Sequence, residues 1–495
     1  MKEYIQINPR DNVVVALTDL TKGTQLEVNG KKVVLTKDVP RGHKIAIENI
    51  KKGENVIKYG DPIGHAKEDI ACGEHVHVNN TKTNLGEIEN YTYNPKYNVV
   101  TYPNRNLTFK GYRRANGEVG IRNELWIVPT VGCVNGIGEQ ILNKFKQEND
   151  ISKIDFAQIF KHNYGCSQLG EDHENTKIIL QNMVKHPNAG GVLVLALGCE
   201  NNQLEAFKAG LGEYDEKRVK FLELQKVENE LEIGVQLLKE LYDEMKNDVR
   251  VDIPLSELKI GMKCGGSDGF SGITANPLVG AFSDFLISQG GTTILTEVPE
   301  MFGAETLLME RAENEEVFNK TVALINDFKA YFTKYDQPIY ENPSPGNKAG
   351  GITTLEDKSL GCTQKGGTAI VVDVLKYGDR LKKNGLNLLT GPGNDLVSAT
   401  GLASTGCHMV LFTTGRGTPF GSFVPTMKIS TNTDLYKRKP HWIDFNAGVL
   451  VEDKTMNEVL EDFIQYVIKV ASGEWVNQEK NGFREIAIFK TGVTL

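Results

Sequence analysis

Ten residues that follow a predicted strand carry a dense set of chemically useful groups. Residues 258–262 are apolar and predict a buried strand, and residues 263–272 then supply a thiol, two hydroxyls, a carboxylate and four glycines. Glycine lets the backbone approach a ligand closely, and ligands of open α/β sheets bind beyond the carboxyl ends of the strands. We therefore expect a site that uses Cys264, Ser267 and Asp268.

Each of the seven cysteines has a glycine as an immediate neighbour. A buried structural cysteine behaves as a small apolar residue and does not need such a neighbour. Cys166, Cys199 and Cys264 follow predicted strands, and Cys362 and Cys407 precede them. This distribution favours a site assembled from several strand ends, although a free thiol is often only a core residue. The spacing matches neither a zinc ribbon nor a ferredoxin, and thiolates favour iron or zinc over magnesium.

A serine hydrolase is a second interpretation of the same stretch. Gly265-Gly266-Ser267-Asp268-Gly269 fits the nucleophile elbow, and Asp395 and His408 follow in the order of the α/β-hydrolases. An elbow serine enters a helix at once, whereas the glycines after Ser267 oppose helix formation. The hydrolase is therefore the weaker interpretation. The chain has no Walker sequence, so nucleotide-dependent chemistry has little support.

The elements that would position these groups form a multidomain α/β protein. Residues 1–80 show four glycine-led segments of alternating pattern and predict a small all-β domain, and residues 81–110 predict a long linker. Residues 111–252 predict a middle α/β domain, with strands at 125–129, 154–160, 192–197 and 219–224. Residues 253–495 predict a second, Rossmann-like α/β domain, with strands at 258–262, 292–296, 369–374, 386–389 and 409–413.

Composition excludes some partners. The chain has 495 residues, a net charge of -8 and 24% charged residues, so no basic surface for nucleic acid or an anionic membrane is expected. No apolar run reaches the ~18 residues that span a bilayer, and no apolar segment follows Met1. We expect a cytoplasmic protein that uses a small-molecule substrate.

Two histidines stand out in the amino-terminal domain. His75 and His77 lie two residues apart on one predicted strand, so both rings project from the same face, as paired metal ligands or a proton-transfer pair would. Two exposed strand histidines are the alternative. Arg122 and Arg416 are candidates for bidentate binding of a carboxylate, and each could equally be a solvated surface arginine.

Long motifs along the whole chain resemble the altronate and galactarate dehydratase family. They include Leu197-Gly198-Cys199-Glu200-Asn201-Asn202, and the full set covers residues 42–44, 56–60, 73–77, 119–123, 164–168, 197–202, 263–272, 297–300, 342–347, 355–362 and 415–419. The resemblance implies an amino-terminal β-clip (SAF-type) domain, a middle domain that forms a homodimer and a Rossmann-like metal-binding domain. It also implies iron-dependent loss of water from a sugar acid, which gives a 2-keto-3-deoxy product.

Dehydration of an aldonate assigns roles to these residues. A proton leaves the carbon next to the carboxylate and hydroxide leaves the next carbon, so the site needs a base, an acid and a Lewis acid. We expect Fe(2+), or Mn(2+) in its place, bound by Cys166, Cys264 and Cys362. Cys199 and Cys407 are further candidate ligands. An iron–sulfur cluster is an open alternative to a single ion. The expected proton-transfer residues are His77, Lys358 and His408, and the expected substrate-binding residues are Arg122, Arg416, Ser267 and Asp268. A galactarate dehydratase or a sulfo-lyase would share this architecture with another substrate.

Overall fold

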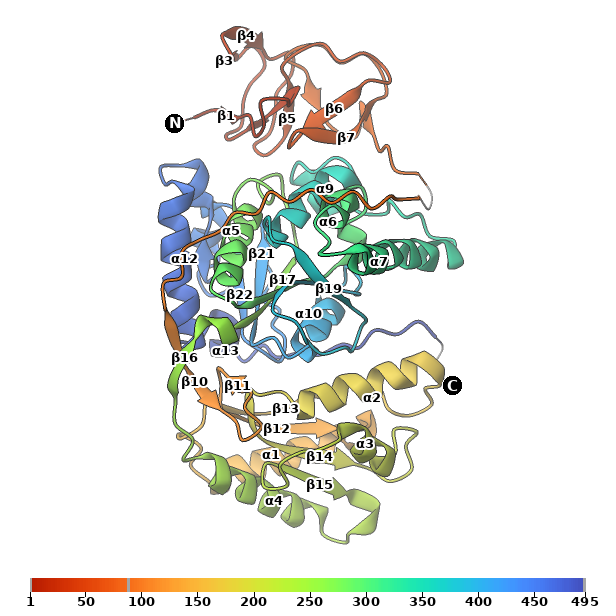
Figure 1. Cartoon of the computed structure of the whole chain (residues 1–495), viewed down its shortest axis with the longest axis vertical. Coiled ribbons are helices and arrows are strands. Elements are labelled where there is room, and N and C mark those ends of the chain that lie inside the picture. Colours follow the sequence, from red (N-terminus) through yellow and green to blue (C-terminus); the bar gives the residue numbers. More distant parts are fainter. Residues whose placement is uncertain (1, 87–89, 493–495) are drawn as a thin grey trace.

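The computed structural model describes residues 2–86 and 90–492. Three bodies stand in a row, with the amino-terminal domain at one end, the carboxy-terminal domain in the centre and the middle domain at the other end (Figure 1). The order of the bodies in space therefore differs from their order in the sequence. Among the described residues, no helix is long and apolar enough to cross a membrane.

The amino-terminal domain consists of short antiparallel strands, as the sequence predicts. They are β1 (Tyr4–Ile5), β2 (Val13–Ala16), β3 (Gln25–Val28), β4 (Lys31–Val34), β5 (Lys44–Ala46), β6 (Asn55–Lys58), β7 (Asp61–Ala66), β8 (His75–Val76) and β9 (Thr81–Lys82), in sheets ordered β1-β2-β5-β8, β3-β4 and β6-β7-β9. The four segment-leading glycines, Gly23, Gly42, Gly53 and Gly73, all have φ between 83° and 87°. A residue with a side chain rarely adopts this conformation, so these turns explain the repeated glycine.

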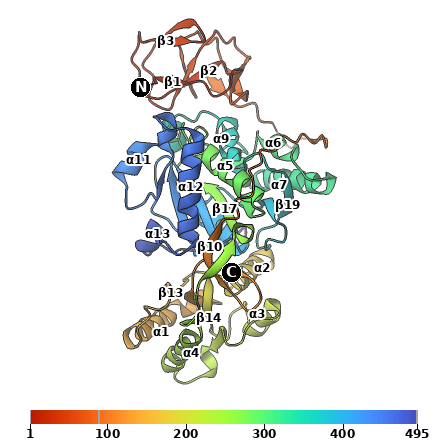
Figure 2. The same cartoon turned by 60° about the vertical axis from the view of Figure 1, so that its left-hand side comes forward.

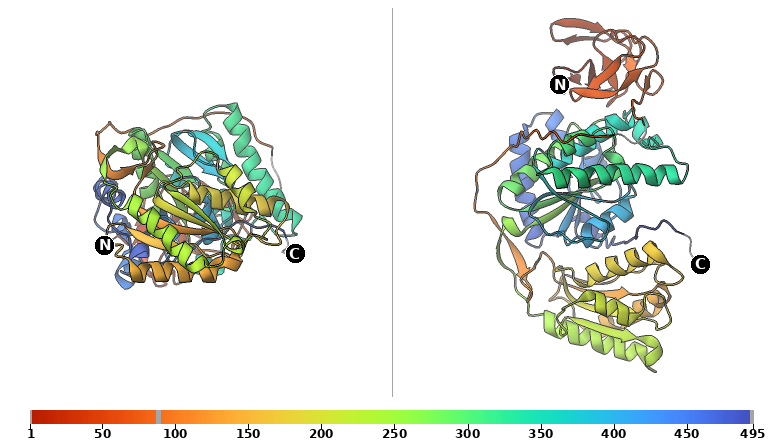
Figure 3. Two further views of the ribbon diagram at one scale, coloured as in Figure 1. Left: turned by 90° about the horizontal axis from the view of Figure 1, so that it is seen from below. Right: turned by 45° about the vertical axis from the view of Figure 1, so that its right-hand side comes forward.

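The linker crosses the carboxy-terminal domain as a strap (Figure 3). Residues 90–107 form no helix or strand. The strap is nevertheless held in place, because Lys96 N donates to Glu310 O at 2.7 Å and Arg105 forms two hydrogen bonds with Glu461. It ends in β10 (Thr108–Arg113), which pairs with β11 (Val119–Gly120) and with β16 (Val251–Pro254) at the junction of the two α/β domains (Figure 2).

The middle domain has a four-stranded parallel sheet. Its strands are β12 (Glu124–Pro129), β13 (Phe156–Ile159), β14 (Ala189–Ala196) and β15 (Val219–Glu223), in the order β13-β12-β14-β15. Its helices are α1 (Asn135–Glu148), α2 (Gly170–Val184), α3 (Leu204–Leu211) and α4 (Glu230–Met245). The apolar residues of α1 and α4 pack on one face of the sheet, and those of α2 and α3 pack on the other.

The carboxy-terminal domain has a seven-stranded parallel sheet ordered β19-β20-β18-β17-β21-β22-β23. Its strands are β17 (Lys259–Cys264), β18 (Thr292–Leu295), β19 (Val371–Leu375), β20 (Gly385–Leu389), β21 (Met409–Thr414), β22 (Thr426–Ser430) and β23 (Phe445–Asn446). Its helices are α5 (Ala275–Ser288), α6 (Glu305–Met309), α7 (Glu315–Lys334), α8 (Pro345–Ala349), α9 (Leu355–Cys362), α10 (Asp395–Ser404), α11 (Thr433–Arg438), α12 (Met456–Ala471) and α13 (Asn477–Lys480). Strands β22 and β23 were not predicted.

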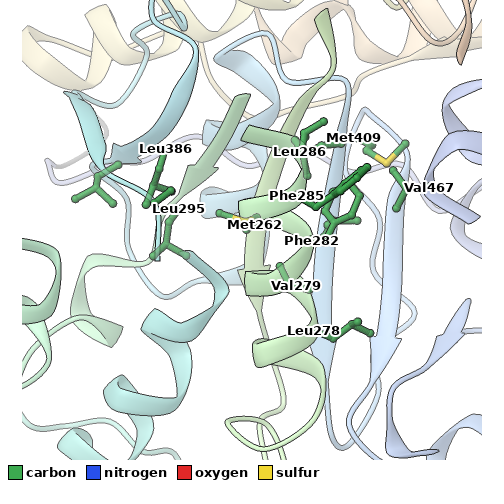
Figure 4. Close-up of a cluster of buried hydrophobic side chains, with 14 of the residues drawn as sticks. Met262, Leu278, Val279, Phe282, Phe285, Leu286, Leu295, Leu386, Met409 and Val467 are labelled. Carbon is green, nitrogen blue, oxygen red and sulfur yellow. The ribbon is translucent and has the colours of Figure 1, made fainter. Parts of the chain in front are cut away.

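The core of this domain lies between the central strands and helices α5 and α12. Met262 and Met409 of the sheet meet Phe282 and Phe285 of α5 and Val467 of α12 (Figure 4). The chain leaves β17 toward β18 on one side and later returns as β21 on the other side. The carboxyl ends of β17 and β21 are therefore a topological switch point, which is where open α/β sheets bind ligands.

Arg122 is a structural residue, which corrects the expectation that it binds a substrate carboxylate. Its guanidinium is fully buried and donates to both carboxylate oxygens of Glu479 at 2.7 and 2.9 Å. It also donates to the backbone carbonyls of Ile121, Val470 and Glu474. These contacts attach the start of the middle domain to the carboxy-terminal domain and leave no face of the guanidinium for a ligand.

Replacing Arg122 with alanine is expected to destabilise the protein strongly. The buried carboxylate of Glu479 would lose both hydrogen bonds from Arg122 and keep the more distant Arg484 at 3.6 Å, and breaking such a buried pair costs about 3–5 kcal/mol. Arg113→Ala is a matched control, because the Arg113–Glu257 pair is partly exposed at 44% and 34% and its loss costs at most ~1 kcal/mol. Urea unfolding of both variants measures the difference, and equal losses would contradict the structural role.

Candidate active site

Two thiols and a carboxylate meet at the switch point. Cys264 ends β17, Cys362 ends α9, and Glu300 ends the 3-10 turn Val298–Glu300 that follows β18. Glu300 Oε2 lies 2.9 Å from Cys264 Sγ and 3.2 Å from Cys362 Sγ, and the two sulfur atoms are 3.4 Å apart. Among the described residues, this is the one group of three or more histidine, cysteine or acidic side chains whose ligand atoms all lie within 4.8 Å of one another. The structure therefore joins Cys264 and Cys362, as expected, and adds Glu300.

Two buried lysines balance the charge of this donor set. Lys358 Nζ lies 2.7 Å from Glu300 Oε1, and Lys365 is 1% exposed. Burial raises the pKa of Glu300, but Lys358 and Lys365 outweigh it and lower the pKa to about 2. The hydrogen bond between the thiols lowers the pKa of Cys264 to about 7 and raises that of Cys362 well above its ordinary value. Glu300 is thus ionised at neutral pH, and Cys264 is the more acidic of the two thiols.

A second carboxylate supports Cys264 from behind. Glu297 accepts a hydrogen bond from the Cys264 backbone N at 2.7 Å and pairs with Lys263 at 3.2 Å. Its φ of 70° lies in the left-handed region, which is unusual for a residue with a side chain. Lys263 also pairs with Asp395 at 2.8 Å, so the residue expected as a hydrolase acid is a partner of this lysine.

A small cavity lies beside the donor set and has the volume of one water molecule, about 10 Å³. Ser267, Asp268, Tyr59, Lys358 and Cys362 are among its lining residues. Ser267 Oγ is buried and, within the part of the chain that the structure describes, has no hydrogen-bond partner. Burial raises the pKa of Asp268, although Thr431 and other donors oppose this. An unpartnered hydroxyl and a carboxyl of raised pKa suit the binding of a polar ligand and proton exchange with it.

The amino-terminal domain forms the roof of this cavity. Lys44 Nζ and Lys58 Nζ contact the two carboxylate oxygens of Asp357 at 2.8 and 2.9 Å, and all three side chains are at most 2% exposed. Burial raises the pKa of Asp357, but the two ammonium groups outweigh it and lower the pKa below its ordinary value. Tyr59, next to Lys58, reaches the cavity, and its pKa is raised to about 12 mainly by burial. Helix α9, which carries Asp357, lies directly under this domain in Figure 1.

Three histidines cluster at the same interface. His43 Nδ1 lies 3.0 Å from His75 Nε2, and the ring of His77 is centred 4.8 Å from that of His43 and 5.6 Å from that of His75. His43 Nε2 contacts Ala349 O at 3.3 Å, and His77 Nδ1 contacts Thr353 Oγ1 at 3.3 Å. The expected juxtaposition of His75 and His77 is present, with His43 as an addition. His77 is not among the lining residues of the small cavity.

Arg416 lines a larger pocket that adjoins the small cavity through Asp268. This pocket has a volume of about 450 Å³ and also contains Arg438 and an ion pair between Arg41 and Asp434. Arg416 is exposed and makes one long contact of 3.4 Å to Gly346 O, so its guanidinium is available to a carboxylate.

Several expected residues lie elsewhere. Cys166 and Cys199 are exposed in the middle domain, and Cys407 is buried in the core at the amino end of β21. His408 adjoins Lys259 at the start of β17, and its Nδ1 accepts a hydrogen bond from Lys259 N at 3.1 Å. Ser267 follows the opposite end of that strand, so the catalytic role of His408 and the hydrolase interpretation are both wrong.

Sequence reasoning missed the residues that do not follow a predicted strand directly. Glu300, Lys365 and Asp357 sit on helical turns, and Lys44 comes from another domain. Glu300 was the one that the sequence could most readily have indicated, because Glu297-Val298-Pro299-Glu300 follows the predicted strand at 292–296.

We expect acid to destabilise the protein through the histidine cluster. Burial lowers the pKa of His75 to about 4 and that of His77 to about 3, against 6.5 in the unfolded chain. Between pH 6.5 and 4 the unfolded state therefore binds more protons, and the stability of the folded state falls as the pH falls. The melting temperature should drop less steeply in this range for a His75→Gln, His77→Gln double variant. His441→Gln, at an exposed position, should keep the wild-type slope, and identical slopes for all three proteins would contradict the assignment.

Three family models match the chain in succession. The Altronate/galactarate dehydratase SAF domain matches residues 2–84, the second domain of D-galactarate dehydratase/Altronate hydrolase matches residues 111–246, and the carboxy-terminal domain of D-galactarate/Altronate dehydratase matches residues 255–494.

Full-length relatives agree with these matches. The chain is 64% identical to an altronate dehydratase of Bacillus subtilis (strain 168) and 59% identical to one of Escherichia coli (strain K12), over 100% of each chain. It is 33% identical to the galactarate dehydratase (L-threo-forming) of Escherichia coli (strain K12), over 95% of this chain and 93% of that one. The chain belongs to the altronate and galactarate dehydratase family of hydro-lyases that act on sugar acids.

Proposed function

We propose that this chain dehydrates D-altronate to 2-keto-3-deoxy-D-gluconate and water. The observation that carries the proposal is the buried set of Cys264, Glu300 and Cys362, which lies beside a cavity that offers Ser267 and Asp268. The full-length likeness to two altronate dehydratases supports the choice of substrate. Galactarate is the second candidate, because a galactarate dehydratase is also similar over most of its length.

The donor set fits a thiophilic divalent ion. Two thiols and one carboxylate within 3.4 Å of one another are softer ligands than magnesium or manganese prefers, and they favour Fe(2+). The proximity of these acidic groups raises the pKa of Cys362, which disfavours its thiolate form. A bound cation would stabilise that thiolate. When bound, the ion would supply Lewis acidity toward the substrate carboxylate or the leaving hydroxyl.

The protein groups can perform the proton transfer and stabilise charge. We propose Asp268 as the base that removes the proton from carbon 2, because it lines the cavity and burial raises its pKa toward the useful range. Burial lowers the pKa of Lys358, but Glu300 and the two cysteines outweigh it and raise the pKa above its ordinary value. Lys358 therefore acts as a fixed cation that stabilises the enolate charge. A role for His77 in proton transfer stays a prediction.

Substrate binding requires the roof of the cavity to move. A space of about 10 Å³ holds one water molecule and not a six-carbon acid, and Lys58 and Tyr59 of the amino-terminal domain close it from above. The pocket of Arg416 and Arg438 lies next to it and provides positive charge for the carboxylate, whereas Arg41 is paired with Asp434. We propose that the acid enters there as the amino-terminal domain shifts.

The wider setting is also a proposal. We propose a cytoplasmic enzyme of hexuronate breakdown that forms a homodimer through the middle domain, as the family resemblance implies. Analytical ultracentrifugation of the full chain measures the assembly, and a monomer at micromolar concentration would exclude the dimer.

Turnover of the two candidate substrates tests the proposed function. Protein reconstituted with Fe(2+) under thiol reductant should convert altronate with a kcat/KM at least ~10-fold above that for galactarate, which corresponds to about 1.4 kcal/mol of transition-state discrimination. Release of a 2-keto-3-deoxy acid is the readout. Preferential turnover of galactarate would replace the proposed substrate, and no turnover of either would remove the function.

Replacing Cys264 tests the donor set. Cys264→Ser exchanges a soft ligand for a hard one, so this variant should lose most of the iron bound at the site and at least ~100-fold in kcat. Cys407→Ser is a matched control, since Cys407 is equally buried, lies outside the donor set and donates from Sγ to Leu402 O. Iron analysis and turnover should show wild-type values for the control, and wild-type values for Cys264→Ser would exclude Cys264 as a ligand.

A further inference from the structure

Three exposed cysteines lie at one edge of the middle-domain sheet. Cys133 follows β12, Cys166 follows β13 and Cys199 follows β14, and these three strands are adjacent in the order β13-β12-β14. Because the strands are parallel, all three thiols lie at the carboxyl edge of the sheet. A glycine precedes each cysteine. None of these thiols belongs to the donor set of Cys264.

The loops that carry these cysteines are bound to one another. Gly132 N donates to Tyr164 O at 2.9 Å, which joins the first loop to the second. Ser167 N donates to Asn201 Oδ1 at 2.7 Å, and Asn202 N donates to Gly165 O at 3.1 Å, which joins the second to the third. A side chain at Gly165 would place its Cβ 2.2 Å from Thr130 O, so the first two loops touch backbone to backbone. The three loops that carry the cysteines are held together as one group.

Each cysteine also lies just before a helix. Helices α1, α2 and α3 begin within two to five residues of Cys133, Cys166 and Cys199 and lead away from this edge. The amino ends of helices favour negative charge, so the positive ends of three helix dipoles meet at this edge. The same loops hold two side-chain oxygens, Asn135 Oδ1 and Asn202 Oδ1, that are buried and accept no hydrogen bond among the described residues. Buried oxygens without donors are rare and call for an explanation.

We propose that Cys133, Cys166 and Cys199 bind an iron–sulfur cluster, with one thiolate on each of three iron atoms. A single metal ion needs its ligands closer together, and the one described group with three ligand atoms within 4.8 Å is that of Cys264. A cluster accepts wider spacing because each thiolate binds a different iron. Binding releases three thiol protons. The fourth iron of a [4Fe–4S] cluster is then left for an oxygen ligand, and Asn135 and Asn202 supply oxygens in these loops. The proposal is independent of the substrate.

Chemical analysis of the full chain tests the cluster. The protein is reconstituted without oxygen using Fe(3+), which thiol reductant partly reduces to Fe(2+), together with inorganic sulfide, and is then desalted. We expect about four acid-labile sulfides per chain, together with broad visible absorption that dithionite bleaches. Cys133→Ser, Cys166→Ser and Cys199→Ser should each lose at least half of the sulfide. Cys264→Ser and Cys72→Ser should keep the wild-type amount.

Two outcomes would overturn the proposal. One is a wild-type chain that binds iron or zinc without labile sulfide, and the other is sulfide that persists in all three single variants. Circular dichroism checks that each variant is folded. Alkylation mapped by mass spectrometry gives a second measurement on the wild-type chain. Reconstitution should protect Cys133, Cys166 and Cys199 from iodoacetamide relative to the untreated protein, and unchanged labelling of these three would also overturn the proposal.

Discussion

The ion pairs of Asp357 with Lys44 and Lys58 determine whether this molecule has an enclosed site. The two lysines stand about 300 residues away from Asp357 in sequence, and their contacts of 2.8 and 2.9 Å fix the amino-terminal domain over α9. The amino-terminal domain also contributes to the cavity beside Cys362, since Lys58 and Tyr59 line it. Within such an enclosed site, charges interact more strongly than in water.

The cost of this arrangement is a high density of buried charge. Glu297 and Glu300 interact with Lys263, Lys358 and Lys365, and Asp357 interacts with Lys44 and Lys58; all eight residues are at most 7% exposed. Such groups are stable only as a set, because removing one partner leaves an uncompensated charge. The same set holds Lys358 as a cation and Glu300 as an anion. Stability and chemistry therefore rest on the same contacts.

The sequence predicts strands and turns well where a single local pattern, such as a turn glycine or an apolar run, determines the structure. Glycine-led turns and apolar runs located the amino-terminal strands, β12 to β15 and β17 to β21. Strand β22 was missed because Thr426, Lys428 and Ser430 are polar residues that are nevertheless fully buried. The site was only half predictable. Strand-end cysteines were recognised, but the sequence does not tell which sheet a strand joins, and Cys166 and Cys264 belong to different sheets. Arg122 was misjudged because its partner Glu479 is 357 residues away.

The spatial order of the domains has a consequence for how the chain is made. Lys44 and Lys58 leave the ribosome with the first domain, whereas Asp357 follows about 300 residues later. At 5–20 residues per second, about 15 to 60 seconds separate the two events. During that time the lysines are hydrated, and the middle domain can fold before the carboxy-terminal domain has been made. The strap must then lie along a domain that is synthesised after it. The enzyme site is thus completed only at the end of synthesis, and a nascent chain is inactive until the last third has folded.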